Sequence, residues 1–170
     1  MGFGNSSLFL KITFVLLIVA FVIQLLALAI PYWFSADNSG VETYGSLFRG
    51  CSKVNANSNS YKSCGKFKNL TSWWEATQAF EVIGILLIIA ALILVIVVIF
   101  VKDMKVLKLV AFILSFCACG CILLGVIIWG AEAFYPYDEY SGSFALAIIC
   151  SIVMLVAGIL GLLDWMGKGK

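Results

Sequence analysis

The chain has 170 residues, of which 63% are hydrophobic and only 12% are charged, so it carries too little polar surface to coat a water-soluble globule of this size. Its formal charge of +2 is close to neutral and its basic residues are scattered, which argues against nucleic acid as a partner. Histidine is absent, which removes the commonest general acid–base and the commonest metal ligand. We therefore expect membrane lipid as the main solvent, and no catalytic site, metal, cofactor or small-molecule substrate.

Four apolar stretches are each long enough to cross a bilayer core of about 30 Å, which needs roughly 20 helical residues. They cover residues 12–30, 82–101, 107–129 and 144–163. The remaining segments are a long loop at 31–81, a cytoplasmic loop at 102–106, a second loop at 130–143 and a short tail at 164–170. Because the 102–106 connection is so short, it predicts an antiparallel hairpin. The sequence thus predicts a single membrane domain, 1–170, with four transmembrane helices.

Lysines near the ends of the predicted spans give the orientation, since cationic residues are retained on the cytoplasmic side. They fall on one side of the predicted membrane and are Lys11, Lys102, Lys105, Lys108, Lys168 and Lys170. We therefore expect a multi-pass protein of the plasma membrane with both termini in the cytoplasm. An alternative for the first span is a cleaved signal peptide, because Ala27-Leu28-Ala29 resembles a signal-peptidase site.

The long loop alternates apolar and polar residues and is punctuated by glycines, which predicts a small extracellular sheet of short strands. Cys51 and Cys64 are the two cysteines of this polar segment, and we predict a disulfide between them. It would close a loop of about 14 residues and stabilise the fold by about 3 kcal/mol. Asn69 begins the glycosylation acceptor Asn-Leu-Thr in the same loop.

Inside the spans, small and weakly polar side chains predominate. Small residues recur at helical spacing and predict seams where helices approach closely; they are Ala111, Ser115, Cys119, Ala147, Ser151, Gly158 and Gly161. Cys117 and Cys121 share a helix face with no further ligand nearby, so we interpret them as buried packing residues, not as a metal site.

We expect Glu81 and Glu132 at the extracellular rim and Asp164 at the cytoplasmic rim, solvated or interfacial. Gly2 fits a loose myristoylation pattern. The plainer interpretation of this N-terminal segment is a flexible cap before the first helix.

The long loop carries Trp33, then Gly45-Ser46-Leu47-Phe48-Arg49-Gly50-Cys51, then Cys64. This pattern resembles the claudin and peripheral myelin protein superfamily of tetraspan proteins, whose first loop carries Trp, Gly-Leu-Trp-x-x-Cys and Cys. Thr77-Gln78-Ala79 and residues 140–147 are similar to family segments at the second and fourth helices. The resemblance implies a left-handed four-helix bundle with an extracellular antiparallel sheet. Phe48 departs from the family tryptophan, Glu81 stands near where claudins usually carry Arg, and the tail has no scaffold-binding motif.

The same resemblance implies a role in cell–cell contact, junctions or membrane organisation, through lateral and trans assembly with further copies or with other membrane proteins. In the second loop, an aromatic turn is the predicted partner contact: Phe134, Tyr135, Pro136 and Tyr137. An alternative function is that of an auxiliary subunit of an ion channel or receptor, as other members of the superfamily are. We expect Trp33, Leu47 and Phe48 where the sheet meets the membrane, with Trp73 and Trp74 in an aromatic belt just before the second helix.

Overall fold

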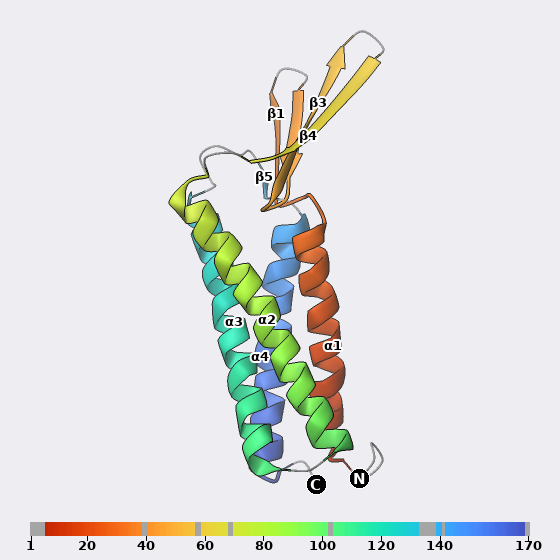
Figure 1. Cartoon of the computed structure of the whole chain (residues 1–170), viewed down its shortest axis with the longest axis vertical. Helices are drawn as coiled ribbons and strands as arrows, with labels where there is room; N and C mark the ends of the chain where they lie inside the picture. Colours follow the sequence, from red (N-terminus) through yellow and green to blue (C-terminus); the bar gives the residue numbers. More distant parts are fainter. Residues whose placement is uncertain are drawn as a thin grey trace.

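The computed structural model of the protein describes residues 6–38, 41–56, 59–67, 70–101, 104–132, 139–140 and 142–168. Four long helices form an elongated bundle, and a twisted antiparallel sheet stands on one end of it (Figure 1). At the other end of the bundle, away from the sheet, α1 begins and α4 ends. The molecule therefore has two poles, a sheet pole and a terminus pole.

The helices are α1 (Leu8–Ala29), α2 (Ser72–Phe100), α3 (Lys105–Glu132) and α4 (Gly142–Trp165). All four are long and apolar enough to cross a membrane. At a rise of about 1.5 Å per residue, the 29 residues of α2 span about 43 Å, which exceeds the bilayer core of about 30 Å. Large apolar side chains on the outer faces of the helices are exposed, as lipid-facing residues should be. The prediction of a four-helix membrane bundle is confirmed.

The helices pack as a closed ring in which α1 contacts α2 and α4, and α3 contacts α2 and α4. Glycines allow the closest approaches: a Cβ at Gly84 would lie 2.6 Å from the Ile122 side chain, and one at Gly161 would lie 3.0 Å from Phe112. Without a strong hydrophobic drive between helices in lipid, such close packing carries much of the association. The small residues predicted to form seams are all buried: Ala111, Ser115, Cys119, Ala147, Ser151, Gly158 and Gly161.

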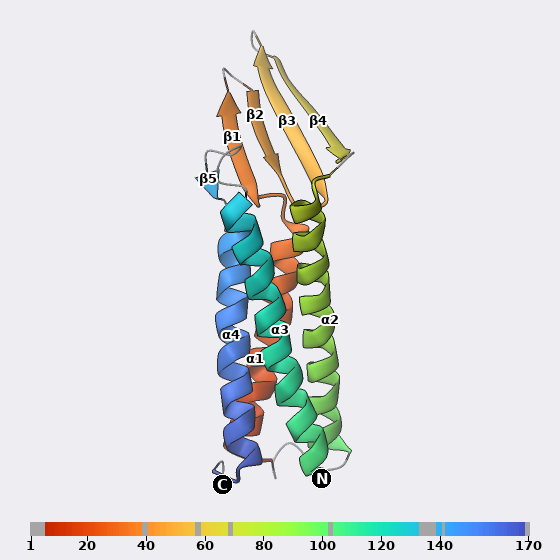
Figure 2. The same cartoon turned by 90° about the vertical axis from the view of Figure 1, so that its left-hand side faces the viewer.

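The loop between α1 and α2 forms four strands, β1 (Phe34–Asn38), β2 (Val41–Gly45), β3 (Arg49–Ala56) and β4 (Asn59–Lys66). A two-residue strand, β5 (Glu139–Tyr140), comes from the second loop and pairs with β1, so the order is β4-β3-β2-β1-β5. Figure 2 shows that the strands run away from the bundle, roughly along its long axis. The sheet predicted for the first loop is confirmed, with a fifth strand from the second loop.

The second helix begins at Ser72, well before the predicted span that starts at residue 82. The apolar run begins only after the polar residues Gln78 and Glu81, but the backbone is already helical at both of them. Trp73 and Trp74 therefore lie in the first turn of α2 and not in the loop that precedes it.

Candidate interaction surface

The turn between β2 and β3 carries most of the motif found in the sequence. The Ser46 hydroxyl accepts hydrogen bonds from the backbone N–H groups of Phe48 at 3.2 Å and Arg49 at 3.1 Å, which shapes the turn. This places Leu47 fully inside the protein, while the neighbouring residue Phe48 remains 41% exposed. The Leu47 carbonyl accepts hydrogen bonds from Trp74 Nε1 at 2.7 Å and from Gln78 Nε2, so the turn is fixed to the start of α2.

Trp33 joins the sheet to α1. Its ring is fully buried, its Nε1 donates to the Ala27 carbonyl at 2.7 Å, and its backbone N–H donates to the Gly45 carbonyl at 2.7 Å. Around it is a cluster of packed rings, the aromatic base, made of Trp33, Phe34, Phe67, Trp73, Trp74 and Trp129. Trp33 and Leu47 were predicted where the sheet meets the membrane, and both are fully buried where the sheet meets the bundle. The two side chains are core residues, however, and not lipid-interface anchors.

A row of glycines lets the sheet lie close to the aromatic base. Gly45, Gly50 and Gly65 are successive partners across β2, β3 and β4, and Phe34 is the partner of Gly45 in β1. A Cβ at Gly45 would lie 2.7 Å from Phe34 Cζ, and a Cβ at Gly50 would lie 2.7 Å from the Phe67 ring. Side chains at Gly45 and Gly50 would therefore displace the rings that hold the sheet.

The predicted disulfide is present between Cys51 and Cys64. The two residues are direct partners in the β3–β4 register, with Cα atoms 4.1 Å apart. Cys51 is buried and Cys64 is exposed. The bond thus adds a covalent link between the edge strand β4 and β3 to the hydrogen-bonded pairing of the two strands.

All six charged residues of β1–β4 lie on one face of the sheet, which we call the charged face. This follows from the strand register, because direct partners in an antiparallel pair point to the same face. Four of the six form one line across the strands, the charged row Asp37–Glu42–Lys53–Lys62. Both acidic residues of the row are on β1 and β2, and both basic residues are on β3 and β4. The opposite face carries no charged residue in these four strands.

The charged face also holds a hollow of about 690 Å³ over β1 and β2. Its lining includes the two acidic residues of the row and the stacked rings of Tyr32 and Tyr44, whose centroids are 5.4 Å apart. Lys53 Nζ lies 3.1 Å from Glu42 Oε2, and both side chains remain substantially exposed. Lys62 Nζ lies 5.3 Å from the Tyr44 ring centroid, and hydrogen bonding to Tyr44 raises the pKa of Lys62 above its ordinary value. The lysine therefore stays protonated at neutral pH.

Glu81 was predicted at the solvated extracellular rim, but the structure places it elsewhere. Its side chain is completely buried between helices and accepts a hydrogen bond from Gln24 Nε2 at 2.5 Å. A Cβ at Gly125 would lie 2.7 Å from Glu81 Oε1, so the glycine makes room for the carboxyl group. The prediction was wrong because α2 begins at Ser72, which puts Glu81 more than two turns inside the helix.

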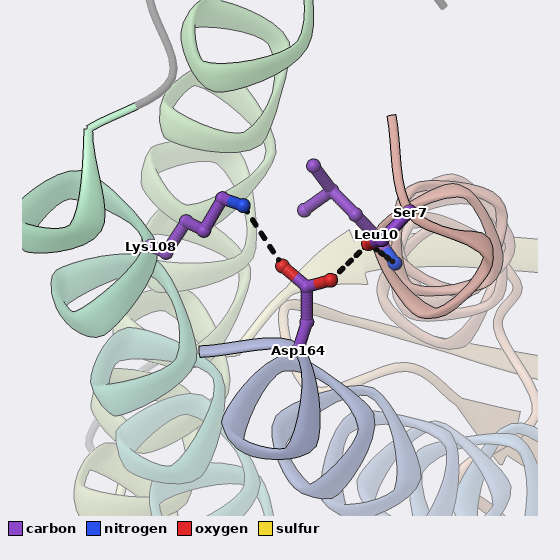
Figure 3. Close-up of polar contacts among 4 residues, drawn as sticks. All are labelled: Ser7, Leu10, Lys108 and Asp164. Carbon is purple, nitrogen blue, oxygen red and sulfur yellow. Dashed lines mark hydrogen bonds and ion pairs between the residues drawn. The ribbon is translucent and has the colours of Figure 1, made fainter. Parts of the chain in front are cut away.

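At the terminus pole, Asp164 is also buried instead of solvated. It lies between α1, α3 and α4, where its Oδ2 is 3.1 Å from Lys108 Nζ and its Oδ1 accepts a hydrogen bond from the Ser7 hydroxyl (Figure 3). The Ser7 hydroxyl oxygen in turn accepts from Leu10 N at 3.2 Å and caps α1. Asp164 thus joins three helices, which the sequence analysis did not anticipate.

Several residues singled out in the sequence fall outside the described part of the chain. These are the acceptor Asn69, the myristoylation candidate Gly2 and the aromatic turn of Phe134, Tyr135, Pro136 and Tyr137. Among the described residues, no group of His, Cys, Asp and Glu is arranged to hold a metal ion. The charged row was missed because it becomes visible only when the strand register is known.

The profile of the PMP-22/EMP/MP20/Claudin family matches residues 6–161. The matched part begins just before α1, includes the whole sheet and ends within α4. No curated protein matches the chain significantly.

Proposed function

This chain belongs to the PMP-22/EMP/MP20/Claudin family of tetraspan membrane proteins, and on that premise we propose that it organises membranes at cell contacts by self-assembly through its sheet. The proposed role is structural, with no chemical reaction assigned to the chain. The partner is a second copy, bound within one membrane or across two.

One observation carries this proposal: the sheet is held rigidly to the bundle while its charged face remains open. Trp33 Nε1, Trp74 Nε1 and Gln78 Nε2 all donate to backbone carbonyls at the junction, so the sheet does not hang on a flexible tether. A surface held in a fixed orientation loses little conformational entropy when it binds a partner, which favours assembly.

The proposal includes an orientation, with the sheet outside the cell, both termini in the cytoplasm and the protein in the plasma membrane. The disulfide between Cys51 and Cys64 supports it, because such bonds form in oxidising compartments. Lys11 and Lys105 near the terminus pole support it as well, since lysines flanking spans are retained in the cytoplasm. Protease protection in intact cells, with epitope tags at each terminus, tests this orientation.

Expression in non-adherent cells tests the function. Cells carrying the full-length protein should concentrate it at contacts between expressing cells, and it should co-purify with a differently tagged copy of itself in mild detergent. Purification with a stoichiometric foreign channel or receptor subunit and no second copy would replace the proposal with an auxiliary-subunit role. Uniform distribution together with strictly monomeric protein would contradict it.

A further inference from the structure

The order of charges along the charged row carries one further inference, which rests on the proposed self-assembly. We propose that the charged face binds the same face of a second copy in the same membrane, about a two-fold axis parallel to the strands. In this dimer Asp37 faces the partner's Lys62, and Glu42 faces the partner's Lys53.

The direction of the row relative to the membrane supports this arrangement. The strands run roughly along the bundle axis, so a row that crosses them lies roughly parallel to the membrane plane (Figures 1 and 2). A two-fold axis along the strands keeps both bundles on the same side and reverses the row. The order acid, acid, base, base then meets base, base, acid, acid, and every position faces the opposite charge.

The symmetric alternative joins two opposing membranes and is disfavoured by the same row. It needs a two-fold axis parallel to the row, which would leave the order of charges unchanged. Asp37 would then face a second Asp37, and Lys62 a second Lys62. Like charges placed opposite each other repel, so the row selects pairing within one membrane over symmetric pairing of this face across two membranes.

Side-chain size is complementary in the same arrangement. In the row next to the charged row, Tyr44 on β2 would face the partner's Cys51 on β3, so a large ring meets a small disulfide-bonded residue. The hollow of about 690 Å³ lies over β1 and β2, where the lysines from β3 and β4 of the partner would enter it.

The charged groups are accessible to such a partner. Asp37 is exposed and has no ion-pair partner among the described residues. Glu42 and Lys53 already form a pair within one chain, but 46% and 37% of their side-chain surfaces are exposed. They can exchange partners across the interface without first being uncovered.

Cysteine cross-linking in the membranes of expressing cells tests the contacts directly. Full-length Asp37→Cys and Lys62→Cys chains with different tags are co-expressed and oxidised with a mild catalyst. We expect disulfide dimers that carry one tag of each kind, and none when either variant is expressed alone. Dimers formed by Asp37→Cys alone would place like residues opposite each other and would overturn the inference.

Charge exchange provides the second test, by energy transfer between labelled copies in one bilayer. Asp37→Lys and Lys62→Asp should each weaken association about tenfold, and the double variant should restore it because the charges are merely exchanged. Ser63→Lys, on the uncharged face beside Lys62, is the matched control and should have no effect. Wild-type association that Asp37→Lys leaves unchanged would overturn this inference and leave the proposed self-assembly intact. Absence of association in the wild type would contradict both this inference and the proposed self-assembly.

Discussion

The indole Nε1 of Trp74 donates a hydrogen bond to the main-chain carbonyl of Leu47 at 2.7 Å, across an interval of 27 residues. Leu47 belongs to the turn of the sheet and Trp74 to the first turn of α2, so this bond joins the sheet to the bundle. The Trp74 ring also packs against Trp129, with centroids 4.7 Å apart. The orientation of the charged face therefore depends on a junction that is both hydrogen-bonded and tightly packed.

Trp74→Phe should weaken this junction, because the aromatic body is largely kept while the donor is lost. We expect the free energy of unfolding to fall by about 1–3 kcal/mol. The lower value applies if the hydrogen bond from Gln78 alone is enough to satisfy the Leu47 carbonyl. Thermal unfolding in mild detergent measures the change. Trp73→Phe is the matched control, since no described hydrogen bond involves its indole, and an equal loss in both variants would contradict the role of the bond.

The glycine row gives a prediction with a control built into the same sheet. Alanine at Gly45 or Gly50 would place a Cβ 2.7 Å from an aromatic ring, and should lower stability by about 1–3 kcal/mol through overpacking. Gly65→Ala, where a Cβ would meet nothing within 4 Å, should change stability by less than about 1 kcal/mol. The unfolding midpoints of the three alanine variants test this prediction. Equal midpoints would contradict it and would show that the aromatic rings can move aside.

The ion pair of Asp164 and Lys108 should contribute more than the exposed pair of Glu42 and Lys53. Asp164→Asn places a neutral amide beside the Lys108 ammonium, and should cost about 1–3 kcal/mol, because both groups are largely removed from water. Glu42→Gln should cost less than about 1 kcal/mol. Unfolding of the two variants in parallel tests this, and a smaller loss for Asp164→Asn than for Glu42→Gln would contradict it.

Gln24 and Glu81 should behave as one unit inside the bundle. Gln24→Leu leaves the buried Glu81 carboxyl without its described donor, and should lower stability by about 1–3 kcal/mol. Changing both residues to Leu should cost less than the single change, because no polar group is then left unpaired. A double-mutant cycle by thermal unfolding measures this coupling, and strictly additive losses would show that the two residues act independently.

Hydropathy was enough to predict the four helices, and the position of Cys51 and Cys64 in a polar segment was enough to predict their disulfide, because each depends on local composition. They were not enough to place Glu81 and Asp164. Both carboxylates interrupt or end an apolar run, and the sequence does not show that Gln24 in one case, and Lys108 with Ser7 in the other, approach from distant helices. Burial of such groups depends on tertiary partners, which a rule for isolated charges cannot include.

The charged row was hidden for a different reason. Asp37, Glu42, Lys53 and Lys62 are spread over four strands, and their alignment depends on the pairing register. A shift of one residue in any strand would move its charged side chain to the other face. The sequence contains the alternation, but the length and geometry of each turn decide which residues become partners.

Energy transfer between two labelled populations of the full-length protein, reconstituted together at increasing lipid dilution, tests self-assembly through the sheet most directly. We predict transfer well above that of randomly distributed monomers for the wild type, loss of most of this excess for Asp37→Lys, and its return for Asp37→Lys with Lys62→Asp. Wild-type transfer no greater than the random value at every dilution would contradict the account.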